Sequence, residues 1–203
     1  MTEPRPAMPP LLFPGSRPAA SFDEPFEMLA ACHGNAERML RLLERLAARL
    51  AETGGDEAAQ QAARDVVRYF DIAAPAHHED EERHVFPALA AHGTPGQKHL
   101  VERLKQDHVE MSRRWQAIKL DLDQVINGQW TVKTQRAAGR AAEPAALAAL
   151  ADWAAFATLY RAHIEAEESG AYPAVQISMD DTARAGMSCE MARRRSVRWP
   201  PES

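Results

Sequence analysis

The chain has 203 residues and a formal net charge of −5, so it is long enough for one domain with a substantial core but lacks the basic surplus typical of nucleic-acid-binding proteins. Aromatic residues are scarce and alanine is abundant, a composition that favours an all-α protein over a β-sheet protein. Two cysteines, Cys32 and Cys189, are too few for a disulfide scaffold or a cysteine-rich zinc site, and they favour a reducing compartment.

The sequence contains no apolar run long enough to span a bilayer, and its first residues lack the pattern of a signal peptide. We therefore expect a soluble, cytoplasmic protein with no membrane partner and no nucleic-acid partner.

Prolines are dense in residues 1–22, which predicts a disordered Pro-rich arm. Beyond this arm, four segments carry apolar residues at alternating spacings of three and four, the periodicity of amphipathic helices that pack side by side. The pattern predicts an all-α fold, an up-down four-helix bundle over residues 23–176. The four expected helices cover about residues 24–53, 56–91, 95–127 and 144–169.

Proline also interrupts the second of these segments. We expect Pro75 to kink or split the helix and Pro87 to end it, because proline lacks a backbone donor and clashes with the preceding turn. A longer polar connection over about residues 128–143 joins the third and fourth segments.

A tail over residues 177–203 follows the bundle, with a short helix expected over about 180–195. It carries three consecutive arginines, Arg193 to Arg195, and then Trp199. We interpret the arginines either as a solvated basic end or as a contact for a protein partner or a second copy in a homodimer.

Each of the four segments has one histidine at a position expected in the core. Two segments add a glutamate four residues later, inside the repeat H-x3-E-E-x3-[FY]-P-A that starts at His77 and again at His163. Residues four apart on a helix point the same way. A buried carboxylate needs a compensating positive charge, and no lysine or arginine lies on these inner stripes. The six candidate metal ligands are His33, His77, Glu81, His108, His163 and Glu167.

This mixed nitrogen and oxygen set predicts a metal pair and suits iron or manganese, with zinc still possible. In the second segment, His78 with Glu82 is an alternative pair, but the repeat favours His77 with Glu81. We expect His78, Glu82 and Glu168 to orient ligands or face water. His84 is expected beside the site or at the surface, and His92 and His99 are expected to be solvated.

Six ligands shared by two ions leave coordination positions open. Four residues on the same stripes are expected to line an apolar pocket there, which suits a small diatomic or peroxide ligand. They are Met111, Trp115, Phe156 and Tyr160, with Tyr160 also a possible proton donor.

Over about residues 24–174 the chain resembles the hemerythrin-like family, also called the HHE cation-binding domain. The resemblance rests on the four histidines and on both copies of the repeat, which end in Phe86-Pro87 and Tyr172-Pro173. It implies a non-haem di-iron centre, two iron ions bridged by an oxo or hydroxo group and two carboxylates. Oxygen carriers of the family have a fifth histidine, whereas this chain has Leu104 and Ser112 at the two possible places. The ligand pattern is closest to bacterial iron-sulfur cluster repair proteins.

The resemblance and the ligand set favour a di-iron protein that binds or reacts with oxygen, peroxide or nitric oxide, or handles iron in oxidative or nitrosative stress. One alternative is a metal-dependent sensor that signals through the tail, and another is a metal-free structural bundle. The sequence shows no nucleophile-base pair and no phosphate-binding loop, so it leaves catalysis undecided.

Overall fold

The computed structural model describes residues 21–52, 54–130 and 144–197, and within these residues the chain is helical with no strand. Residues 1–20 of the expected Pro-rich arm, most of the expected polar connection and Trp199 lie outside the described residues. The elements are α1 (Pro25–Glu52), α2 (Glu57–Arg68), η1 (Tyr69–Ala73), α3 (Ala74–Asp80), η2 (Glu81–Val85), α4 (Phe86–His92), α5 (Pro95–Ile126), α7 (Pro144–Ala166), η3 (Glu167–Ala171), α8 (Tyr172–Ser178) and α9 (Asp181–Arg194), where η marks a π-helix.

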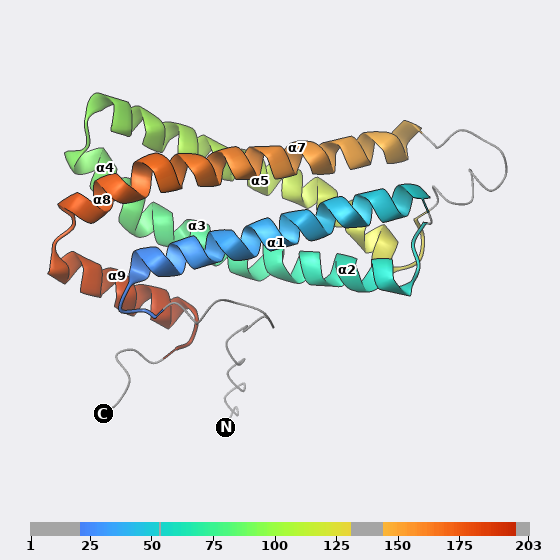
Figure 1. Cartoon of the computed structure of the whole chain (residues 1–203), viewed down its shortest axis with the longest axis horizontal. Helices are drawn as coiled ribbons and strands as arrows, with labels where there is room; N and C mark the ends of the chain where they lie inside the picture. Colours follow the sequence, from blue (N-terminus) through green and yellow to red (C-terminus); the bar gives the residue numbers. More distant parts are fainter. Residues whose placement is uncertain (1–20, 53, 131–143, 198–203) are drawn as a thin grey trace, which may run out of the picture.

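Four long rods lie side by side in alternating directions (Figure 1). The first is α1, the second runs from α2 to α4, the third is α5, and the fourth runs from α7 to α8. Helix α1 packs against α2 and α7, and α5 packs against the same two, which closes the bundle. The predicted all-α, up-down four-helix bundle with a short C-terminal helix is confirmed. Its boundaries at residues 23 and 176 stay a prediction, and α8 runs on to Ser178.

Each of the three π-helices lies just before a proline, and the rods continue through these prolines. The residue before each proline donates its backbone N–H to the carbonyl five residues back: Ala74 to Tyr69, Phe86 to Glu81, and Tyr172 to Glu167. A proline ring clashes with the carbonyl four residues back in an α-helix, and the wider π turn moves that carbonyl away. The expectation that Pro87 ends the second helix is therefore wrong, since this rod continues to His92.

The interior consists of two apolar clusters with a polar layer between them. Along α1, Leu29 belongs to one cluster and Ala36 to the other, with His33 between them. Along α5, Leu104 and Met111 flank His108 in the same way. On the second and fourth rods the two apolar clusters follow each other in the opposite order along the chain. Antiparallel packing therefore brings the histidine and glutamate positions of all four rods to one level.

Helix α9 packs across one end of the bundle against α1 and α3 (Figure 1). Its last residue, Arg194, and the following Arg195 bind Asp80, whose side chain is fully buried. Arg194 Nε lies 2.6 Å from Asp80 Oδ1, and an Arg195 guanidinium nitrogen lies 2.6 Å from Oδ2. The interpretation of the arginines as a solvated basic end is therefore wrong for these two residues. They neutralise a buried carboxylate that α3 places beside Glu81.

Replacing Asp80 with asparagine should destabilise the protein by about 3 kcal/mol, because two largely buried guanidinium groups would lose their counter-charge. Urea denaturation would measure the difference. The matched control is Glu79→Gln, which removes an exposed ion pair to Arg83 and should change the stability by less than about 0.5 kcal/mol. If the two substitutions changed the stability equally, the role of Asp80 as the counter-charge of the two arginines would be contradicted.

Within the described part of the chain, no helix combines the length and apolar character needed to cross a membrane.

Candidate metal centre

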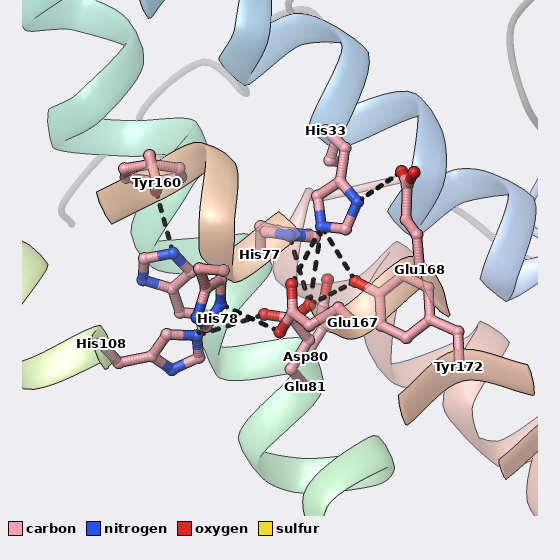
Figure 2. Close-up of polar contacts among 12 residues, drawn as sticks. His33, His77, His78, Asp80, Glu81, His108, Tyr160, Glu167, Glu168 and Tyr172 are labelled. Carbon is pink, nitrogen blue, oxygen red and sulfur yellow. Dashed lines mark hydrogen bonds and ion pairs between the residues drawn. The ribbon is translucent and has the colours of Figure 1, made fainter. Parts of the chain in front are cut away.

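The six predicted ligand residues converge at the level between the two apolar clusters, and Figure 2 labels all of them except His163. Each residue is at most 4% exposed, and both glutamates are fully buried. The structure therefore brings together every residue of the predicted set, His33, His77, Glu81, His108, His163 and Glu167.

These residues form two groups that share both carboxylates. One group contains His33 and His77 with Glu81 and Glu167, and the other contains His108 and His163 with the same two glutamates. Within each group one potential ligand atom per residue lies within 4.8 Å of the others. Closer pairs include His163 Nε2 and Glu167 Oε1 at 3.0 Å and His77 Nε2 and Glu81 Oε1 at 3.4 Å. This is the arrangement expected of two cations bridged by two carboxylates.

Carboxylates on the outer side of the cluster fix three of the four imidazole rings, those of His33, His108 and His163. His33 Nδ1 lies 2.9 Å from Glu168 Oε1, and His108 Nδ1 lies 2.8 Å from Glu82 Oε1. A carboxylate accepts hydrogen bonds, so in each pair the Nδ1–H donates outward and the Nε2 lone pair points into the cluster. Each of these two glutamates thus orients a histidine of a neighbouring rod, and the role of that histidine as a metal ligand stays a prediction.

The inner atoms show why the cluster suits a cation. His108 Nε2 and His163 Nε2 lie 3.1 Å apart, although both rings turn their Nδ1 atoms towards carboxylates. Two lone pairs that face each other at this distance repel unless a positive charge lies between them. Among the described residues, neither oxygen of Glu167 accepts a hydrogen bond of good geometry, nor does Glu81 Oε2. Buried acceptors that face one another are the donor set of a metal ion.

The pKa shifts of two of the four histidines also suit metal binding. Burial lowers the pKa of His77 to about 3 and lowers the pKa of His163, so both rings are neutral near pH 7. Burial and the charge of Glu81 raise the pKa of Glu167 well above its ordinary value. A cation would displace the proton that the raised pKa leaves on Glu167, because carboxylate ligands must be ionised.

A cavity of about 500 Å³ borders the second group at His108. Its walls include the four residues predicted to form an apolar pocket, Met111, Trp115, Phe156 and Tyr160. His78 also lines it, stacked on His108 with 4.0 Å between ring centroids. Its Nε2 lies 2.9 Å from the Tyr160 hydroxyl, so His78 faces the cavity while His77 faces the cluster. The structure therefore favours the predicted choice of His77 over His78.

Sequence reasoning missed two residues that contact the cluster. Tyr172 brings its hydroxyl within 3.1 Å of His33 Nε2 and donates a hydrogen bond to Glu81. Asp107 lies 3.4 Å from His163 Nδ1 and supports that ring. The available signals were weak, since Tyr172 stands where the other repeat copy has Phe86 and Asp107 directly precedes a predicted ligand.

The remaining histidines lie outside the cluster. His84 faces Glu190 of α9 at 3.5 Å, while His92 and His99 are exposed, as expected. Leu104 is buried in an apolar cluster and Ser112 lines the cavity, so neither adds a ligand to the site.

Comparison with known proteins agrees with this geometry. The family described as Hemerythrin HHE cation binding domain matches residues 24–175, a range that contains all six clustered side chains. An uncharacterised protein of Haemophilus influenzae is 34% identical over 110 residues, which is 54% of this chain. The match spans 63% of that relative, less than two thirds of its length. The family description names cation binding, which is the chemistry that the buried cluster suits.

Proposed function

The chain belongs to the hemerythrin HHE cation-binding domain family, and from this premise we propose that it holds two iron ions and binds or reacts with oxygen, peroxide or nitric oxide, or handles iron in oxidative or nitrosative stress. His33 and His77 would hold one ion, His108 and His163 would hold the other, and Glu81 and Glu167 would bridge them. We also propose that the protein works in the cytoplasm.

The observation that carries this proposal is the pair of four-residue groups that share both carboxylates beside a cavity. Mixed imidazole and carboxylate ligands suit iron and manganese, and zinc fits the same donors. Iron would supply redox chemistry and open coordination positions for a small ligand.

The surrounding residues would tune this centre in three ways. Glu82, Glu168 and Asp107 hold their histidines in the tautomer that presents Nε2. The aromatic walls of the cavity limit water near His108. The Tyr160 hydroxyl and His78 form a polar pair between that cavity and the cluster, where a proton could be held beside a bound ligand.

Protein expressed with ample iron should contain about two irons per chain, because two complete ligand groups are present. The oxidised protein should show the near-ultraviolet absorption of a bridged ferric pair, and the reduced protein should change its spectrum when nitric oxide is added. Iron analysis and absorption spectroscopy measure both. The proposal would be contradicted by protein that stays free of iron, or by iron-loaded protein whose spectrum does not change when nitric oxide is added.

A sensor is the second candidate function, favoured by the two arginines that bind Asp80. Asp80 directly precedes Glu81, so the binding or loss of metal could alter the contact between α3 and α9. Metal loading would then change the protection of residues 181–194 against hydrogen exchange, and equal protection in loaded and stripped protein would exclude this route.

A further inference from the structure

The two copies of the sequence repeat place different aromatic residues beside the metal ligands. Phe86 packs against His108 with 5.3 Å between ring centroids. Tyr172, at the matching position, stacks on His33 at 5.4 Å with an interplanar angle of 9°. The two places are equivalent in the fold, but only one of these two rings carries a hydroxyl group. The internal symmetry of the ligand set is therefore broken at this position.

The hydroxyl of Tyr172 points into the cluster (Figure 2). It lies 3.1 Å from His33 Nε2 and donates to Glu81 Oε1, and the residue is only 5% exposed. Both partner residues belong to the same four-residue group, which also contains His77 and Glu167. The phenol oxygen therefore lies among the atoms expected to face one ion.

The spacing of these atoms matches that of neighbouring ligands on a single ion. Two ligands at right angles around a metal with bonds of about 2.1 Å are about 3.0 Å apart. His33 Nε2 lies 3.2 Å from Glu167 Oε2 and 3.1 Å from the Tyr172 hydroxyl oxygen. The tyrosine oxygen thus stands at the same separation from His33 as a proposed carboxylate ligand does.

We propose that Tyr172 is a seventh metal ligand, which releases its hydroxyl proton to solvent and binds, as phenolate, the ion held by His33 and His77. This inference rests on the proposed function. It predicts two unequal ions, since the first would have five protein ligands and the second four. The second ion would keep more open positions, and its ligand His108 borders the cavity. A small ligand would therefore bind at the ion held by His108 and His163.

Iron-loaded wild-type protein should show the visible charge-transfer band of phenolate bound to ferric iron and the tyrosinate modes in its resonance Raman spectrum. Tyr172→Phe should lose both signals and should weaken binding of one iron by about tenfold or more. The matched control is Tyr160→Phe, which removes another buried hydroxyl near the cluster and should keep the band.

The outcomes separate this inference from the proposed function. Wild-type protein with two irons but no tyrosinate signal would overturn the ligand assignment and leave the di-iron proposal standing. A signal that survives Tyr172→Phe and disappears in Tyr160→Phe would also overturn it. Wild-type protein that binds no iron would overturn both proposals. Because the Raman test uses the wild-type chain, a variant that fails to fold cannot obscure the result.

The proposal that the small ligand binds at the ion held by His108 and His163 can be tested separately. A second hollow lies beside His33 and is lined by Ser169, so each ion has a hollow that can be filled. Ser112→Trp should fill the cavity at His108 and slow nitric oxide binding by about tenfold or more. Ser169→Trp makes the same change beside the first ion and should leave the rate unchanged. Both variants should keep two irons and the tyrosinate band. A slower rate only in Ser169→Trp would place the small ligand at the first ion.

Discussion

Glu81→Gln is expected to abolish binding of both iron ions, whereas His33→Ala should remove one and leave the other. Glu81 belongs to both ligand groups and lies within 3.5 Å of a ring nitrogen in each, His77 Nε2 at 3.4 Å and His108 Nε2 at 3.5 Å. An amide keeps the size of the side chain but supplies no negative charge to offset two cations. His33 belongs to one group only, so its loss leaves the second group complete.

Iron per chain, measured on purified protein expressed with ample iron, gives the result directly. We expect about two irons in wild type, fewer than about 0.2 in Glu81→Gln and about one in His33→Ala. Glu79→Gln is the control, since it makes the same chemical change two residues away on an exposed side chain and should keep both irons. A Glu81→Gln variant that retains one full ion would show that the carboxylates do not bridge.

The sequence predicted the cluster of six buried side chains because this set follows from helical periodicity. A histidine on an otherwise apolar stripe, with a glutamate four residues later, points to the interior in any packed bundle. Glu81 and Glu167 add the decisive information, since buried carboxylates need positive charge and their stripes carry none. Four antiparallel rods then leave one level at which all six residues can meet.

Other features depend on tertiary contacts that periodicity does not encode. Arg194 and Arg195 look like a solvated end in the sequence, but their partner Asp80 lies more than a hundred positions away in the chain. Pro87 looks like a helix end because an α-helix cannot accommodate its ring, whereas a π turn can. Tyr172 looks like an aromatic packing residue, and the stacking on His33 decides where its hydroxyl points.

Removal of iron is expected to lower the thermal midpoint of unfolding by about 10 °C or more. A ligand present at a thousand times its dissociation constant stabilises the native state by about 4 kcal/mol, and each kcal/mol shifts the midpoint of a chain of this size by about 2 to 4 °C. The stripped protein must bury Glu81 and Glu167 without a cation and must keep the ring nitrogens of His108 and His163 facing each other. These groups repel or remain poorly solvated, so the loss of metal removes the charge that makes their burial favourable.

Differential scanning calorimetry before and after chelation measures the shift, and restoration by added iron shows that it is reversible. The difference should shrink as the pH falls, because protons compete with the cation for the same imidazole and carboxylate groups. The same chelator should leave the midpoint of Glu81→Gln unchanged, since that variant has no iron to lose. If wild-type protein were equally stable with and without iron, the hydrogen bonds within the polar layer would be enough to satisfy its buried groups. The chain would then be better described as a structural bundle than as a metal-binding protein.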